Sequence, residues 1–395
     1  MRIAMFTDHF FPELGGIQDS VATISRALGR RGHQVDIYAP RYGRRDYRRI
    51  GATVRERDLG PNVSVRRRPS VPFPSSTRQS RAVLLSPTAW AALAYRAKPD
   101  VIHAHSFFAI GLEALLAAAC LRIPVIGTNH WTVAGFGPHL PMSVNNAAAY
   151  VRWFYNRCDY VTAPSRSVFV ELGATRLRRP QAVVSNPIDT DLFRPVRDDE
   201  RDALRARFGL TRPTITYAGR LGPEKNIEVL LRAMAALRDQ GVAADLAVAG
   251  HGSHEPILRM LVGALRIGQQ IRFYGTLAQD ELAQLLQVSD AFAIMSTSET
   301  QSMVLLQAMA SGIPVVAANT RALPEFVTHA NGLLVDPYDV AGLAQSLADL
   351  LASPDRRRQL GAAGRKFVEQ YCVETITDEW EALYRSVLFG SEPRG

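Results

Sequence analysis

The chain has 395 residues, of which 47% are hydrophobic and 21% charged, and this length predicts two domains with ordinary packed cores. Its three cysteines have neither metal-ligand spacing nor the pattern of a disulfide framework, which favours a reducing compartment. No apolar stretch is long enough to span a bilayer, and the first residues enter a strand without the succession of regions that marks a signal peptide. We therefore expect a cytoplasmic protein.

Positive charge is concentrated in the first half of the chain. Residues 1–197 contain 27 Lys and Arg against 13 Asp and Glu, a net charge of +14, whereas the remainder carries −5. Many of the basic residues are arginines between positions 41 and 81. A basic domain favours an anionic membrane surface, a phosphorylated acceptor or nucleic acid as a partner, although a solvated arginine-rich surface gives the same counts.

Short apolar runs alternate with helical patterns in the first half. A helix is predicted over residues 19–31, because Val21, Ile24 and Leu28 recur at helical spacing before Gly32. The segment 41–74 is rich in Arg, Pro and Gly and predicts loops around one or two short strands. Strands are predicted at 2–7, 34–38, 63–65, 101–104, 125–128 and 160–163. This alternation is typical of a parallel, doubly wound sheet.

A second alternating unit follows a turn-forming segment at 183–196, where Pro187 and Pro195 discourage a helix. Its strands are predicted at 214–218, 244–249, 271–274, 291–294, 315–317 and 332–334, and its helices include 226–240, 280–286 and 340–352. A last amphipathic helix is predicted at 376–388. The sequence therefore predicts α/β domains over 1–185 and 186–375, a C-terminal helical segment over 376–395, and ligands at the carboxyl ends of the strands.

Glycines mark the first strand-to-helix turn. Gly15 and Gly16 let the backbone approach a phosphate or a sugar, and a plain tight turn is the alternative. The G-x-G-x-x-G pattern of dinucleotide-binding proteins is absent, which argues against an ordinary dehydrogenase.

Two cations lie on the loop after the first strand of the second unit. Arg220 and Lys225 can neutralise a diphosphate leaving group, unless they are merely solvated loop residues. Because these cations suffice, and no Asp-x-Asp lies beside a predicted strand end, we expect no metal ion.

The segment 298–317 predicts a polar turn, a helix, a Gly-Pro break and a buried strand. Glu299 precedes the helix, whose first amides, at residues 302–305, form a phosphate-binding end. Gln307 lies eight residues after Glu299, so the two side chains can hold different parts of one elongated ligand, such as a sugar linked to a nucleotide through a diphosphate. A core helix preceded by a chance glutamate is the alternative.

Further candidate residues follow other predicted strands. His130 follows the strand at 125–128 and is expected to point into a ligand cleft, whereas His103 and His105, at and after the strand at 101–104, are either acceptor contacts or packed core histidines. Gly250 follows the strand at 244–249, and Gly275 and Thr276 follow the strand at 271–274.

The loop at 219–226 and the segment 298–317 closely resemble the retaining glycosyltransferases of family 4, which share the GT-B fold of two Rossmann-like domains facing across a cleft. The resemblance covers nearly the whole chain. It implies an acceptor-binding first domain, a second domain that binds a nucleoside diphosphate sugar as co-substrate, a final helix that returns to the first domain, and no other cofactor. It also implies front-face attack, in which the leaving phosphate helps to take the proton of the acceptor.

The resemblance assigns roles to the candidate residues. Arg220 and Lys225 match the G-R-x(4)-K signature. Glu299 is the first glutamate of the family's Glu-x(7)-Glu motif, and Gln307 replaces the second, which holds ribose hydroxyls. The other implied contacts are His130 with the transferred sugar, Ser302 and Met303 with the sugar, Val304, Leu305, Gly15 and Gly16 with the diphosphate, and Gly250, Gly275 and Thr276 near the nucleotide, whose base remains open.

The segment 298–301 resembles the subgroup that glycosylates diacylglycerol and other membrane lipids. A UDP-sugar such as UDP-glucose is favoured over a GDP-sugar. The basic first domain fits peripheral binding to an anionic membrane, and Trp90, Leu93 and Ala94 belong to an interfacial helix or to an ordinary core helix. His105 is a candidate acceptor contact. The alternatives are a small soluble acceptor and, because of Gln307, a weakly active sugar-nucleotide sensor or scaffold. No nucleic-acid module is recognisable, so we expect no nucleic-acid partner.

Overall fold

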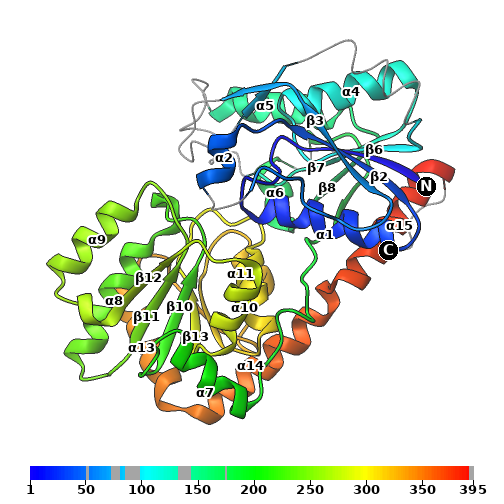
Figure 1. Cartoon of the computed structure of the whole chain (residues 1–395). Coiled ribbons are helices and arrows are strands. Elements are labelled where there is room, and N and C mark those ends of the chain that lie inside the picture. The colour runs from blue at the N-terminus through cyan, green and yellow to red at the C-terminus, as the bar shows by residue number, and fades with distance from the viewer. Residues whose placement is uncertain (50–52, 73–80, 85–97, 132–143, 174–175, 391–395) are drawn as a thin grey trace. The chain divides into compact units, whose positions relative to one another are not determined.

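The computed structural model describes residues 1–49, 53–72, 81–84, 98–131, 144–173 and 176–390. The chain divides into two compact units, one formed by Met1–Pro187 with Val373–Gly395 and the other by Ile188–Cys372. Each unit is built around a parallel sheet with helices on both faces, so the prediction of two doubly wound α/β units is confirmed (Figure 1). Trp90, Leu93 and Ala94 lie outside the described residues.

The first unit contains a seven-stranded parallel sheet in the order β3-β2-β1-β6-β7-β8-β9. Its strands are β1 (Arg2–Phe6), β2 (Gln34–Pro40), β3 (Val63–Arg68), β6 (Val101–Ala104), β7 (Val125–Thr128), β8 (Tyr160–Ala163) and β9 (Gln181–Val183), and β4 (Ser70–Pro72) pairs with β5 (Arg81–Val83) in an antiparallel ribbon. Its helices are α1 (Gly16–Arg30), α2 (Arg44–Arg49), α4 (Ala109–Leu121), α5 (Val144–Tyr155), α6 (Arg166–Glu171) and α15 (Val373–Phe389).

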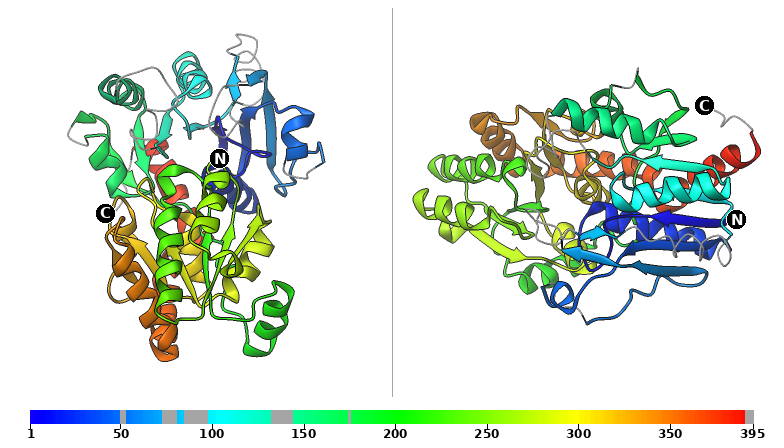
Figure 2. Two further views of the ribbon diagram at one scale, coloured as in Figure 1. Left: turned by 90° about the vertical axis from the view of Figure 1, so that its left-hand side faces the viewer. Right: turned by 90° about the horizontal axis from the view of Figure 1, so that it is seen from above.

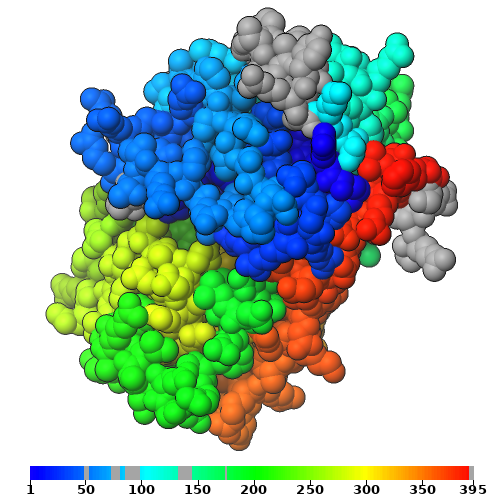
Figure 3. Space-filling view, turned by 45° about the vertical axis from the view of Figure 1, so that its right-hand side comes forward, coloured from blue at the N-terminus to red at the C-terminus, as the bar shows by residue number. Residues whose placement is uncertain are grey.

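Alternate side chains of these strands enter two different helix layers. Phe6 and Ile102 pack with α4 and α5 on one face of the sheet. Met5 on the other face contacts Ser25 of α1, and His103 contacts Tyr384 of α15. Helix α15, drawn in red, therefore packs beside the blue N-terminal elements of this unit (Figure 3).

The second unit contains a six-stranded parallel sheet in the order β12-β11-β10-β13-β14-β15. Its strands are β10 (Thr214–Ala218), β11 (Asp245–Ala249), β12 (Ile271–Gly275), β13 (Ala291–Ile294), β14 (Val315–Ala318) and β15 (Leu333–Val335). Its α-helices are α7 (Asp198–Arg207), α8 (Ile227–Asp239), α9 (Glu255–Ala264), α10 (Gln279–Gln287), α11 (Met303–Ala310), α12 (Leu323–Phe326), α13 (Val340–Ala352) and α14 (Pro354–Val368). Helices α8 and α13 pack together on one face of the sheet and α11 packs with α10 and α14 (Figure 2).

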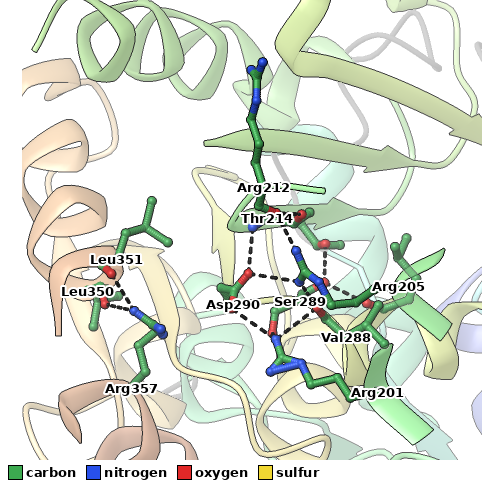
Figure 4. A network of polar contacts seen from close by, with 12 residues as sticks. Arg201, Arg205, Arg212, Thr214, Val288, Ser289, Asp290, Leu350, Leu351 and Arg357 are labelled. Carbon is green, nitrogen blue, oxygen red and sulfur yellow. Dashed lines mark hydrogen bonds and ion pairs between the residues drawn. The ribbon is translucent and has the colours of Figure 1, made fainter. Parts of the chain in front are cut away.

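Asp290 joins three elements at the amino edge of this second sheet (Figure 4). Its carboxylate accepts hydrogen bonds from Arg201 at 3.0 Å and Arg205 at 3.2 Å, both on α7, and from the backbone N–H of Thr214 at 2.8 Å. The same two arginines also donate to the carbonyl of Val288. A single carboxylate therefore fixes α7 to the starts of β10 and β13, at the edge opposite to the one where ligands bind in such sheets.

Candidate active site

Three loops meet at the carboxyl edge of the second sheet. A Cβ atom added to Gly250 would lie 1.8 Å from the carbonyl oxygen of Gly219, and one added to Gly252 would lie 2.1 Å from that of Leu221. Gly250 also has a φ of +136°, and its N–H donates to the carbonyl of Gly275 at 2.6 Å. The loops after β10, β11 and β12 thus pack backbone against backbone, which only glycine permits at position 250.

Lys225 and Glu299 form a buried ion pair. Lys225 Nζ lies 2.6 Å from Glu299 Oε1, and the two side chains are 16% and 12% exposed. Burial opposes ionisation of Glu299, but the neighbouring Lys225 outweighs it and lowers the pKa of this carboxyl below its ordinary value. The N–H of Thr297 donates to the carbonyl of Glu224 at 3.0 Å and ties the two loops together. The site therefore holds a carboxylate and an ammonium in fixed positions.

Arg220 is held beside this pair by Glu224, a residue that the sequence interpretation did not single out. Its Nη2 lies 2.6 Å from Glu224 Oε1, and its side chain remains 43% exposed. The hydroxyl of Tyr217 donates to the Arg220 carbonyl at 3.0 Å and fixes the backbone from which this side chain departs. The position of Glu224 inside the G-R-x(4)-K segment is the signal that was available for it.

Helix α11 presents its amino end next to the same loop. Ser302 precedes it with a left-handed φ of +68°, and no side chain caps the helix start. The Ser302 hydroxyl is buried without a hydrogen-bond partner among the described residues. By helix geometry the first amides, those of Met303, Val304 and Leu305, have no carbonyl of a preceding turn to bind, so this end attracts anions.

The remaining candidate residues of the second unit lie on neighbouring elements. Gln307 is buried on α11, and its Nε2 donates to Gln279 Oε1 of α10 at 3.5 Å. Gly275 has a φ of +66°, and Thr276 after it is exposed. A carboxylate, two cations, a helix amino end and three glycine-bearing loops therefore share one edge of one sheet.

In the first unit, the sequence candidates gather at the carboxyl edge of the sheet. Helix α1 begins at Gly16, with Gly15 as its N-cap, so the predicted start at residue 19 was three residues late. Both glycines are exposed, and no side chain caps the helix. Its first amides are therefore open to a ligand.

The histidines of this edge differ in their contacts. His103 is bonded at both nitrogens, to the Tyr384 hydroxyl at 2.8 Å and to Thr128 Oγ1 at 2.6 Å, so it is a packed core histidine. His105 Nδ1 lies 3.1 Å from His130 Nε2, and His105 Nε2 is buried with no partner in the described part of the chain. Burial, together with the charge of His9, lowers the pKa of His130 to about 3, so its ring is neutral at pH 7.

Three acidic or basic residues of the first unit were missed by sequence reasoning. Asp8, His9 and Glu13 are buried on the loop between β1 and α1, next to the predicted glycines. Their place directly after a strand was a usable signal, because the carboxyl ends of parallel strands carry ligand sites.

The described residues contain no group of three or more His, Cys, Asp or Glu side chains arranged to hold a metal ion. Within the same residues, no helix combines the length and apolar character needed to cross a bilayer.

Comparison with known proteins identifies the family. Residues 14–192 match the model described as Glycosyltransferase Family 4, and residues 199–367 match that described as Glycosyl transferases group 1. The chain is 28% identical to the alpha-monoglucosyldiacylglycerol synthase of Streptococcus pneumoniae, over 90% of this chain and 79% of that one. It is 30% identical to a GDP-mannose-dependent alpha-mannosyltransferase of Mycolicibacterium smegmatis, over 98% of both chains.

Solved structures agree with the fold. The sucrose-phosphate synthase of Thermosynechococcus elongatus superposes with a TM-score of 0.79 at 21% identity, over 98% of this chain and 99% of that one. Anabaena HepE, solved with UDP and glucose, superposes with a TM-score of 0.78 at 20% identity, over 98% and 100%. This chain therefore belongs to glycosyltransferase family 4 and is a retaining hexosyltransferase with the GT-B fold.

Proposed function

We propose that the protein transfers a hexose from a UDP-sugar to a hydroxyl group of a membrane lipid such as diacylglycerol. The observation that carries the donor half of this proposal is the Lys225–Glu299 pair, 2.6 Å apart, on loops that also carry Arg220 and the start of α11. It supports the proposal because a sugar and a diphosphate would need fixed charges of both signs close together.

The donor is proposed to lie along the carboxyl edge of the second sheet. Arg220, Lys225 and the amides of Val304 and Leu305 would hold the diphosphate, and their positive charge would stabilise it as the bond to the sugar breaks. Glu299 and the amides of Ser302 and Met303 would bind sugar hydroxyls. Gln307 would hold the ribose, and the backbone around Gly250, Gly275 and Thr276 would lie near the nucleotide. Gly15 and Gly16 are proposed as further contacts of the diphosphate.

No metal ion is needed in this scheme, because cationic side chains balance the leaving group. The neutral ring of His130 would contact the transferred sugar, where an uncharged imidazole can both donate and accept a hydrogen bond. His105, bonded to His130, would support that ring beside the acceptor. The leaving phosphate itself would help to take the acceptor proton.

A UDP-sugar is favoured because HepE, a structural relative, was solved with UDP-glucose as well as with UDP. The sequence relatives also include GDP-mannose-dependent mannosyltransferases, so the assay below compares both nucleotides.

The lipid acceptor is supported by charge and by relatives. Arg44, Arg45 and Arg48 are exposed on α2, and Arg41 and Arg55 are exposed near it in the sequence. Each arginine near an anionic bilayer contributes about 1 kcal/mol of attraction, so several together favour peripheral binding at the inner face of the cytoplasmic membrane. The relatives include the Streptococcus pneumoniae synthase named above and phosphatidylinositol monomannoside mannosyltransferases of Mycobacterium tuberculosis.

A transfer assay tests this proposal. The protein is incubated with labelled UDP- and GDP-hexoses, cell lipid and soluble extract, and the products are partitioned between organic and aqueous phases. Label in a new organic-phase product supports a lipid acceptor. A new aqueous product, lost in the Lys225→Met variant, assigns a soluble acceptor instead and leaves the arginines as surface charge.

Two other candidates have observations in their favour. A soluble acceptor is favoured by 27% identity to the N-acetyl-alpha-D-glucosaminyl L-malate synthase of Bacillus anthracis. A sensor or scaffold is favoured by Gln307, where the family motif has glutamate. We expect Gln307→Glu to change turnover less than about tenfold, because glutamine can also hold ribose hydroxyls. A rise of about a hundredfold would support the sensor.

A further inference from the structure

His9 occupies a position at the carboxyl edge of the first sheet that the proposed site does not use. Its Nδ1 lies 2.9 Å from Glu13 Oε1, and the two side chains are 10% and 7% exposed. The Tyr42 hydroxyl donates to the other Glu13 oxygen at 3.1 Å. Both carboxylate oxygens are thus engaged, so Glu13 fixes the ring and its Nδ1 proton.

The second nitrogen of this ring remains available. No described residue forms a hydrogen bond to His9 Nε2, although the ring packs on Trp131 with centroids 5.1 Å apart. Burial opposes the charged form of His9, but Glu13 and then Asp8 outweigh it and raise its pKa above the ordinary value. The raised pKa favours the doubly protonated ring, which carries a proton on Nε2 as well as on Nδ1, more than an ordinary pKa would.

The other titratable groups around His9 either have hydrogen-bond partners of their own or are uncharged. The Asp8 carboxyl accepts from Ser106 Oγ at 2.5 Å and from the backbone N–H of Ile110 in the first turn of α4. Burial raises the pKa of Asp8 to about 6 despite these bonds. His130 on the neighbouring strand end is neutral. Nε2–H is thus the charged donor of this group that lacks a partner among the described residues.

Arg67 supports the loop that carries His9 through hydrogen bonds to backbone carbonyls. Arg67 of β3 donates to the carbonyls of Phe11 at 2.6 Å and Pro40 at 2.9 Å, and its guanidinium lies 5.5 Å from the ring centroids of Phe10 and Tyr42. The Arg67 charge also lies over the ring of Tyr42, whose hydroxyl holds Glu13. A rigid support of this kind holds a donor in place before its ligand arrives.

We propose that His9 is an anion-binding residue, whose Nε2–H donates to a phosphate oxygen of a substrate, with Glu13 and Tyr42 as positioning residues. The proposal rests on the proposed function, because it takes a phosphate-bearing substrate for granted. The exposed start of α1 at Gly15 and Gly16 lies on the same loop and adds partial positive charge. The phosphate belongs either to the donor diphosphate or to the headgroup of an anionic lipid.

Calorimetric titrations of the full chain separate these two sources. UDP is the probe for the donor, and glycerol 3-phosphate, added with UDP at saturation, is the probe for the headgroup. His9→Gln weakens binding of the relevant probe by about 10- to 100-fold, the usual effect of losing a hydrogen bond to a charged group. His33→Gln is the matched control, because His33 pairs with Glu381 at 2.8 Å in the same unit but directly before β2, at the amino edge.

The pH dependence distinguishes binding from a structural role. Affinity for the probe falls in the wild-type protein as the pH rises through the pKa of His9, and this component is absent in His9→Gln. Tyr42→Phe removes only the hydroxyl that holds Glu13 and moves the fall along the pH axis, while melting monitored by circular dichroism shows that the variants fold. Equal affinities for both probes in His9→Gln and His33→Gln overturn the proposal.

The same experiment separates this inference from the proposed function. If Lys225→Met loses UDP binding and His9→Gln affects neither probe, the inference about His9 fails and the proposed function stands. If the wild-type protein binds neither UDP nor GDP, both fail.

Discussion

Replacing Lys225 with methionine tests the centre of the proposed donor site. The substitution keeps the apolar stem and removes the ammonium that lies 2.6 Å from Glu299. Because both side chains are largely buried, Glu299 is left as an uncompensated carboxylate. Breaking a buried pair in this way costs about 3–5 kcal/mol, and we expect about 3 kcal/mol because the pair keeps some contact with solvent.

The effect on transfer is larger than the loss of stability explains. Removing one fixed charge or donor from a developing anion lowers kcat by about 100- to 1,000-fold. Glu299→Gln alone also reduces turnover, because it weakens the bonds to sugar hydroxyls. The double variant Lys225→Met/Glu299→Gln recovers stability, since no lone charge remains buried, but it does not recover turnover.

The pH dependence of stability follows from Glu299. Its lowered pKa stabilises the wild-type fold above the ordinary value of about 4.5, and this contribution is lost as the pH falls through the folded-state pKa. Lys225→Met removes the largest influence that lowers this pKa, and only the hydrogen bond from Ser296 and the charge of Arg220 still oppose the effect of burial. The pKa of Glu299 is therefore higher in this variant, which gains stability relative to wild type as the pH is lowered from 7.

Urea unfolding followed by circular dichroism, together with steady-state transfer rates, measures both effects. Lys366→Met is the matched control, because Lys366 is exposed on α14 of the same unit and should change neither quantity. A folded Lys225→Met variant with turnover within threefold of wild type would refute the role assigned to this lysine.

Three other expectations follow from the described contacts. Gly250→Ala should abolish nucleotide binding and lower the melting temperature, because its Cβ would meet the Gly219 carbonyl at 1.8 Å, whereas Gly263→Ala in open space on α9 should be neutral or stabilising. Asp290→Ala should lower the free energy of unfolding in urea by about 3 kcal/mol, because Arg201 and Arg205 lose their only carboxylate partner among the described residues, whereas the exposed Asp355→Ala should cost less than about 0.5 kcal/mol. Burial lowers the pKa of both His103 and His130 to about 3, so the contribution of these neutral rings to stability should be fully present above about pH 6.5 and be lost as the pH falls towards 3. The melting temperature of His130→Gln should therefore fall less steeply with decreasing pH than that of the wild-type protein, and an unchanged slope would contradict the assignment.

Much of the fold was predictable because its strands are buried on both faces. The strands at 101–104, 125–128, 160–163, 214–218 and 291–294 have the predicted bounds, since a strand covered by two helix layers is a continuous apolar run. The start of α1 was not predicted correctly, because glycine at residues 15 and 16 gives no clear signal for the first residue of a helix. Helix α2 within the arginine-rich segment was also missed, because six residues with one buried aromatic, Tyr47, show no periodicity.

The candidate site likewise contains some residues that the sequence pointed to and others that it did not. Arg220, Lys225 and Glu299 were proposed from their loop positions and from the resemblance to the motifs of the family, and their roles stay predictions. The structure does place Lys225 against Glu299. The partners of these residues depend on tertiary contacts that spacing does not encode. Nothing local indicates that His9 and Glu13 pair within a non-helical loop under Tyr42.

Pairing of cations with carboxylates also bears on which ligand the site selects. A diphosphate bound near Lys225 adds negative charge beside Glu299 and so raises the cost of keeping that carboxylate ionised and buried. Sugar hydroxyls that donate to Glu299 offset this cost, and UDP alone supplies none at that position. We therefore expect a UDP-hexose to bind more tightly than UDP, with the difference reduced in Glu299→Gln, whose neutral amide suffers no such repulsion. Equal affinities of the wild-type protein for the two ligands would show that Glu299 does not face the sugar.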